Sequence, residues 1–267
     1  MNVSGNNSIF SLSRLGVLRL TGRDVLPFLQ GQVTLDVGKL DHTLRPAGYC
    51  DPKGRLLALF YLTLRDSSVY AVASRDTLES LTRRLTLYTL RRDVRICIDD
   101  THTVCGTLGP HTFSKDDALY TKGTATLALT ENPSGGNADD TSWWEAASCE
   151  FIPFVFSQSQ GKFLPQSLNL DLNGAVSFNK GCYVGQEIVS RIHSLGTPAR
   201  RLALYQGSQM PFAAGSDLMD SEGNPKAVTV YSAGTRALVE CSVRDTPQTL
   251  YLQNGKALSL VSRQELL

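Results

Sequence analysis

The chain has 267 residues, and its hydrophobic fraction of 42% is enough to build one large core or two to three smaller ones. Its 26 basic and 25 acidic residues give a formal net charge of +1, so no global field favours a nucleic acid or an anionic membrane. We therefore expect no direct nucleic-acid binding. The longest apolar run, at 56–64, suits a buried strand and is too short to span a membrane.

The six cysteines are widely spaced and contain no Cys-x-x-Cys pair, which is typical of a reducing compartment. Residues 1–10 lack the basic head and apolar run of a signal peptide. These features predict a cytoplasmic protein. His102 and Cys105 form a His-x-x-Cys pair without a second pair nearby, so no metal site is predicted.

The first half of the chain alternates strands with two helices. Residues 1–13 are polar and are expected to be loosely ordered. Asp24 is a suitable N-cap for a short helix, and Asp76 with Glu79 resembles a capping box before a second one. Helices are predicted at 25–30 and from 76 to about 88; strands are predicted at 15–20, 55–64, 69–73, 91–98, 104–108 and 124–130. This order indicates an α+β layer, a sheet with a helix on one face.

The second half changes from helix to strand. The stretch 131–142 reads as a linker, and a helical segment follows from Trp143 to about residue 151. Only short strands follow Arg201, separated by Gly, Pro and Asn. They are predicted at 202–205, 227–231, 236–243, 250–252 and 257–261, which indicates a small barrel or an open sandwich.

Between these parts lies the sequence Lys-Gly-Cys-Tyr-Val-Gly-Gln-Glu at 180–187. Ile188, Ile192 and Leu195 then share one helical face, and Gly196 fits a helix stop. Glu187 and Arg191 are spaced as an ion pair on this helix. Cys182 is therefore predicted in a glycine-flanked loop just before a helix N-terminus.

This position suits a reactive sulfur. The positive end of the helix and the neighbouring Lys180 would both favour the thiolate of Cys182 over the thiol. A thiolate can attack, bind metal or be oxidised. The alternative is a small residue buried in a tight turn, and the local sequence leaves both interpretations open.

The stretch 180–187 resembles, without a gap, the signature of the YgfZ family of folate-binding proteins, which are similar to the T-protein of the glycine cleavage system. Further matches lie at 163–166, 169–170 and 176–179, and in the N-terminal block 20–37. The resemblance implies three domains around a central opening. They are a discontinuous folate-binding domain (1–48 plus 143–199) carrying the cysteine loop, an inserted ferredoxin-like α+β domain (49–142) and a C-terminal β-barrel (200–267).

The resemblance also implies a function. It suggests an accessory protein that binds tetrahydrofolate or a derivative and supports assembly or repair of iron–sulfur enzymes, including those that methylthiolate tRNA. Cys182 and Lys180 would carry the chemistry. Trp143 would stack on the pterin, although it could instead anchor its helix in the core. Gln186, Glu187 and Arg191 are further candidate ligands, and Arg191, Arg200 and Lys180 are candidates for the anionic glutamate tail.

Two positions depart from the family and its enzyme relatives. A second aromatic contact of the family falls at Leu15, which weakens the expectation of tight folate binding. The alternative function, tetrahydrofolate-dependent aminomethyl transfer, needs a carboxylate where this chain has Ala58 and Leu59. Their side chains cannot transfer a proton, so the sequence favours the accessory role. The expected partners are folate and iron–sulfur enzymes or assembly proteins, and the chain is expected to be a monomer.

Overall fold

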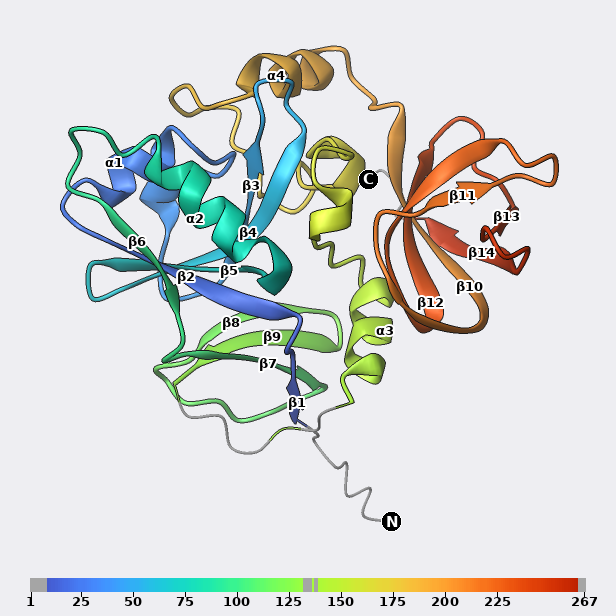
Figure 1. The fold of residues 1–267 in the computed structure, drawn as a ribbon, viewed down its shortest axis with the longest axis horizontal. Helices are drawn as coiled ribbons and strands as arrows, with labels where there is room; N and C mark the ends of the chain where they lie inside the picture. Colours follow the sequence, from blue (N-terminus) through green and yellow to red (C-terminus); the bar gives the residue numbers. More distant parts are fainter. Residues whose placement is uncertain (1–8, 132–135, 137–138, 264–267) are drawn as a thin grey trace.

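The computed structural model describes residues 9–131, 136 and 139–263, which fold into two antiparallel sheets and a closed β-barrel. Figure 1 shows the two sheets on one side of the molecule and the barrel on the other. Residues 1–8 of the predicted polar stretch, and 132–135 and 137–138 of the predicted linker, lie outside the described residues. The remainder of the polar stretch contains a short strand, where loose order was expected.

The five-stranded sheet carries both predicted helices of the first half. Leu78, Leu81 and Leu85 bury one stripe of α2 against it, as their spacing requires. Asp66 and Ser67 both have positive φ and form the two-residue turn of a tight hairpin. The strand order is β3 (Arg45–Cys50), β4 (Leu56–Arg65), β5 (Ser68–Ser74), β2 (Leu15–Thr21) and β6 (Arg95–Asp99), with helices α1 (Val25–Gln30) and α2 (Leu78–Thr86).

The four-stranded sheet packs against helix α3 (Thr141–Cys149), which lies between the sheets and the barrel (Figure 1). Gly106 allows this approach, because a Cβ there would lie 2.3 Å from Nε1 of Trp143. The strand order is β1 (Ile9–Ser11), β7 (Thr103–Leu108), β9 (Ala125–Thr130) and β8 (Ala118–Lys122).

A largely irregular segment connects α3 to the barrel and carries helix α4 (Gln186–Ser194). Four short 3-10 turns complete the helical structure of the described residues. They are η1 (Val37–Lys39), η2 (Arg75–Thr77), η3 (Ser157–Ser159) and η4 (Gln166–Leu168).

The C-terminal strands close into a barrel, which decides between the two predicted architectures. The two strands predicted at 227–231 and 236–243 are one long strand that bends at Gly234, where φ is +56°. A side chain would be strained at this φ, which glycine adopts freely, and Glu145 on α3 accepts a hydrogen bond from the backbone N–H of the next residue, Thr235. The barrel order is β10 (Arg200–Ala213), β12 (Pro225–Ser242), β11 (Asp217–Met219), β13 (Thr249–Tyr251) and β14 (Ala257–Arg263).

Aromatic side chains fill the junction between the sheets and the barrel. The ring of Trp144 lies 5.1 Å from those of Phe154 and Phe212 and 5.2 Å from that of Tyr231. These residues belong to a core cluster that spans both sheets, α3 and the barrel. The resemblance predicts a central opening here, and two cavities adjoin the core where residues of the first half, of the segment 140–158 and of the barrel meet.

The predicted α+β class with a C-terminal barrel is confirmed, and β10 begins at the predicted boundary, residue 200. The boundary at 48/49 does not separate two units. It falls inside β3, and β2 of the predicted first domain pairs with β5 and β6 of the predicted second. Strand pairing across the boundary therefore joins both stretches in one sheet.

Candidate functional site

The signature loop places Cys182 at the surface, four residues before the first residue of α4. Gly185 caps the helix with φ at +83°. A Cβ on Gly185 would lie 2.5 Å from the carbonyl oxygen of Asp51 and 2.8 Å from Cα of Gly54. The helix therefore begins in direct backbone contact with the β3–β4 turn, and the loop carrying Cys182 is fixed at that end.

Lys180 fixes the other end of the loop. Its Nζ donates hydrogen bonds of 2.7 Å to the carbonyl oxygens of Val33 and Leu35, and it lies 5.2 Å from the ring centre of Tyr183. Burial lowers the pKa of Lys180 to about 8, while the Asp36 carboxylate acts in the opposite direction. The hydrogen bonds of this ammonium go to backbone carbonyls, and the expectation that Lys180 favours the thiolate of Cys182 stays a prediction.

The other signature candidates lie on α4. The side-chain oxygen of Gln186 accepts a hydrogen bond from the Tyr183 backbone N–H at 3.3 Å, so this residue braces the loop. Glu187 and Arg191 are both exposed. Their predicted ion pair is not formed in the described part of the chain. Both charges therefore face solvent on α4, the helix that follows Cys182 in the sequence.

Trp143 lies in the core and not at a ligand site. Its side chain has no exposed surface, and its Nε1 donates a 3.0 Å hydrogen bond to the carbonyl oxygen of Thr126. A flat ring reaches neither face of this indole without displacing its neighbours. The structure thus gives Trp143 the anchoring role that the sequence left as the alternative, and it does not bring Trp143 together with the signature loop.

The positions that bear on aminomethyl transfer carry no acid. Ala58 and Leu59 are buried on β4, as is Leu15 on β2. The nearest carboxylate in sequence, Asp51, accepts hydrogen bonds of 2.9 Å from the backbone N–H groups of Lys53 and Arg55. It shapes the β3–β4 turn, and no side chain on this part of β4 is equipped for proton transfer.

Two adjoining cavities, of about 440 and 570 Å³, open at the margin of the aromatic core and share Arg14 and Phe212. The guanidinium carbon of Arg14 lies 4.3 Å above the ring of Phe212. Its Nη1 donates a 2.9 Å hydrogen bond to Asp140, whose other oxygen accepts from Nε1 of Trp144 at 2.9 Å. Arg75 and Phe156 line the larger cavity. We call this pair the Arg14–Phe212 cavity.

Sequence reasoning missed this cavity, although it named two neighbouring positions. Leu15 and Trp143 directly adjoin Arg14 and Trp144 in the chain. Phe212 comes from the barrel, and nothing in the local sequence links it to either position. None of the seven predicted site residues lines the Arg14–Phe212 cavity.

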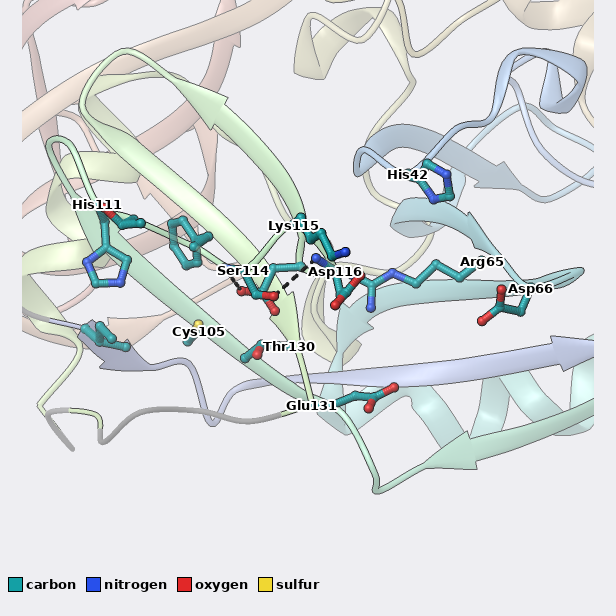
Figure 2. A pocket seen from close by; sticks show the side chains of 14 residues that line it. His42, Arg65, Asp66, Cys105, His111, Ser114, Lys115, Asp116, Thr130 and Glu131 are labelled. Carbon is teal, nitrogen blue, oxygen red and sulfur yellow. Dashed lines mark hydrogen bonds between the residues drawn. The ribbon is translucent and has the colours of Figure 1, made fainter.

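A third cavity, of about 600 Å³, lies beside the four-stranded sheet (Figure 2). Figure 2 shows Arg65 reaching from β4 toward the turn that carries Ser114 and Asp116. Burial raises the pKa of Cys105, in its wall, to about 11, so this thiol is less acidic than an ordinary one. Basic and acidic side chains are balanced around it, and no predicted site residue belongs to it. Its charged lining comprises His42, Arg65, His111, Lys115, Asp66, Asp116, Asp117 and Glu131.

Two further observations bear on function. Among the described residues, no group of three or more His, Cys, Asp or Glu side chains could hold a metal ion. Within the same residues, no helix is long and apolar enough to cross a membrane.

Comparisons with known proteins agree on one family. No family model matches the chain. An uncharacterized protein of Haemophilus influenzae is 30% identical, with 85% of this chain and 84% of the relative covered. The tRNA-modifying proteins YgfZ of Escherichia fergusonii and Shigella sonnei are also 30% identical, with 79% of this chain and 76% of each relative covered.

A solved structure supports the fold. The glycine cleavage system aminomethyltransferase T from Bartonella henselae superimposes with a TM-score of 0.69 at 17% identity, over 96% of this chain and 85% of that one. This likeness confirms the predicted T-protein-like fold. The YgfZ relatives at 30% identity show the family: the chain belongs to the YgfZ family.

Proposed function

We propose that this protein binds a folate in the Arg14–Phe212 cavity and uses the exposed Cys182 thiol in the maintenance of iron–sulfur enzymes that modify tRNA. The observation that carries the folate proposal is the Arg14 guanidinium, stacked on Phe212 and hydrogen-bonded to Asp140. This arrangement already binds a planar group with N–H donors along its edge.

A pterin has the same features as that guanidinium. It is flat, and its 2-amino group and N3–H form an edge of parallel donors that suits a carboxylate. Displacement of Arg14 would open the ring of Phe212 for stacking and Oδ1 of Asp140 for one of these donors, while Oδ2 keeps its hydrogen bond from Trp144. The residues present therefore fit the group, with Phe212 supplying the aromatic contact expected at position 15.

The cavity also suits the rest of a folate. Arg75 lines the larger part, and its Nε is bonded to the carbonyl oxygen of Ser13 at 2.8 Å, so its guanidinium is held at the cavity wall. A carboxylate tail prefers such a group. The two parts together are of the size typical of small-molecule sites.

The thiol proposal rests on exposure and on a fixed loop. Cys182 is exposed, and Lys180 and Gly185 hold its loop at both ends. One thiolate is too few ligands to hold an iron–sulfur cluster alone, so Cys182 would act on a cluster shared with a partner protein. Glu187 and Arg191, exposed on α4, would meet that partner. The name of the YgfZ relatives, tRNA-modifying protein, supports this direction.

Aminomethyl transfer is disfavoured as the alternative, even though the fold resembles that of such an enzyme. Ala58 and Leu59 offer no acid or base on β4. Turnover of an aminomethyl donor by the pure protein with tetrahydrofolate would overturn this part of the proposal.

The folate proposal is tested by titrating 5-formyltetrahydrofolate into the protein and following binding by calorimetry. Loss of the stacking face in Phe212→Ala should weaken binding by about tenfold. Arg14→Ala should strengthen binding, because no guanidinium then needs to be displaced. Phe113→Ala, in the third cavity, is the matched control. Equal affinity of Phe212→Ala and the wild type would refute the site.

The thiol proposal is tested in cells that lack the protein. Cys182→Ser should fold normally, bind the folate with unchanged affinity and fail to restore tRNA methylthiolation. Cys97→Ser removes another exposed thiol and should restore it fully. Full restoration by Cys182→Ser would refute a role for this sulfur.

A further inference from the structure

A cavity of about 570 Å³ lies between the C-terminal end of α4, the segment 162–167 and the barrel. Figure 1 shows α4 above the start of β10, where the chain enters the barrel. No residue that lines the Arg14–Phe212 cavity lines this one. We call it the α4–barrel cavity, and neither proposed function uses it.

The walls of the α4–barrel cavity are aliphatic. Leu195 is 76% exposed, which is unusual for so large an apolar side chain, and it lines the cavity. No aromatic side chain lines the cavity, so it offers a pterin no ring to stack on. These walls suit an alkyl chain. The aliphatic lining consists of Leu164, Ile192, Leu195, Pro198, Ala199, Pro225, Ala227 and Val228.

The charged lining of this cavity has four basic side chains, Arg55, Lys162, Arg200 and Lys226, and two acidic ones, Asp217 and Glu240. Arg200 is paired with the buried carboxylate of Glu240. Nη1 of Arg55 donates to the carbonyl oxygen of Lys162, and Nζ of Lys162 donates to that of Gly215, both at 2.6 Å. Within the described residues, neither Arg55 nor Lys162 forms an ion pair with a carboxylate.

One polar group of the lining is incompletely bonded. Gln166 is 1% exposed, and its Nε2 donates a 2.6 Å hydrogen bond to the carbonyl oxygen of Val189 on α4. Its Oε1 is buried and has no hydrogen-bond partner within the described residues. Because an unpaired buried acceptor costs free energy, a ligand with a hydroxyl or N–H donor would gain by bonding to it once the Gln166 side chain turns Oε1 toward the cavity that the residue lines.

We propose that the α4–barrel cavity binds an aliphatic carboxylic acid with a hydroxyl or amide donor near its head. The alkyl chain would lie against Ile192 and Leu195, the carboxylate would bind Arg55 and Lys162, and the donor would bond to Oε1 of Gln166. Each of these groups comes from a different part of the chain, and together they supply an apolar wall, an anion site and an acceptor.

The test is calorimetry of the full chain with octanoate, decanoate, 2-hydroxydecanoate and uncharged decanol as probes. Burial of two more methylenes should make decanoate bind about 15-fold more tightly than octanoate. The added hydroxyl should strengthen binding further, and decanol should bind more weakly than decanoate. Absence of decanoate binding at about 1 mM, far weaker than common metabolite sites, would overturn the proposal. Equal affinity for decanoate and 2-hydroxydecanoate would refute the proposed hydrogen bond from the ligand to Gln166.

Two exposed residues allow variants that leave the core intact. Arg55→Ala should weaken decanoate binding by about tenfold without changing decanol binding. Leu195→Asp should weaken both, whereas Leu172→Asp, a matched exposed leucine outside the cavity, should weaken neither. Wild-type affinity in Arg55→Ala and Leu195→Asp would overturn the site. Phe212→Ala should bind decanoate normally, so failure of the folate proposal would leave this result unchanged.

Discussion

The ion pair between Arg201 and Asp171 ties the barrel to the turn that follows η4. Both side chains are nearly buried, at 8% and 12% exposure. Nη1 of Arg201 donates to Asp171 Oδ1 at 2.5 Å and to the carbonyl oxygen of Gln166 at 2.7 Å, and Nη2 donates to Asp171 Oδ2 at 2.8 Å. The pair is therefore bidentate, which is the strongest geometry for these two groups.

Substitution of one partner leaves the other as an uncompensated buried charge. Asp171→Asn should lower the free energy of unfolding by about 3 kcal/mol, within the range for broken buried pairs. That is a large share of the total stability of a typical protein, about 5–15 kcal/mol. The measurement is urea unfolding followed by tryptophan fluorescence. Asp245→Asn, at an exposed position, is the control and should change stability by less than about 0.5 kcal/mol.

A double-mutant cycle separates the pair from its surroundings. Arg201→Met alone should also destabilise, because it removes a donor from the Gln166 carbonyl and leaves Asp171 unpaired. The double variant Arg201→Met/Asp171→Asn should cost less than the sum by about 2 kcal/mol, since no unpaired charge remains. Additive losses, or a loss below about 1 kcal/mol in Asp171→Asn, would refute the reasoning.

Three further changes test the signature loop and the core. The pKa of Lys180 is about 8 in the folded protein and 10.5 ordinarily, so the unfolded chain binds more protons between pH 8 and 10.5. The free energy of unfolding should therefore rise with pH over this range, and urea titrations of Lys180→Met should lack that rise. Gly185→Ala should cost at least about 2 kcal/mol through its positive φ and the clash with Asp51, whereas Gly181→Ala, with open space around it, should be neutral in the same assay. Trp143→Ala should cost about 3–5 kcal/mol in thermal or urea unfolding because the indole is fully buried; a loss below about 1 kcal/mol would contradict its anchoring role.

Local patterns predicted most elements of the fold. The helix at 25–30 has its predicted bounds, and β2, β4 and β5 lie within a residue of theirs. The strands β3, β8 and β11 were not predicted. Errors occurred where distant contacts decide. The helix predicted to reach Tyr88 ends at Thr86, and Tyr88 is 45% exposed. The break predicted within β12 is a residue of positive φ, Gly234, inside one continuous strand.

The signature predicted the position of the cysteine loop but not the roles of its neighbours. A loop before a helix N-terminus follows from the glycines and the helical spacing, and α4 is there. The role of Lys180 depends on Val33 and Leu35, which lie far away in the sequence. Proximity in the chain therefore suggested an electrostatic partner for Cys182, whereas the fold uses this lysine to anchor the loop.

The proposed folate site was beyond sequence reasoning for the same physical reason. Arg14 comes from the turn before β2, Asp140 from the start of α3, and Phe212 from the barrel. Each residue has an ordinary local role, and only the packing of α3 between the sheets and the barrel brings them together. The thiol lies on a different segment, held by the β3–β4 turn. In our proposal, folate binding and thiol chemistry therefore rest on different segments, so Phe212→Ala and Cys182→Ser should impair them separately.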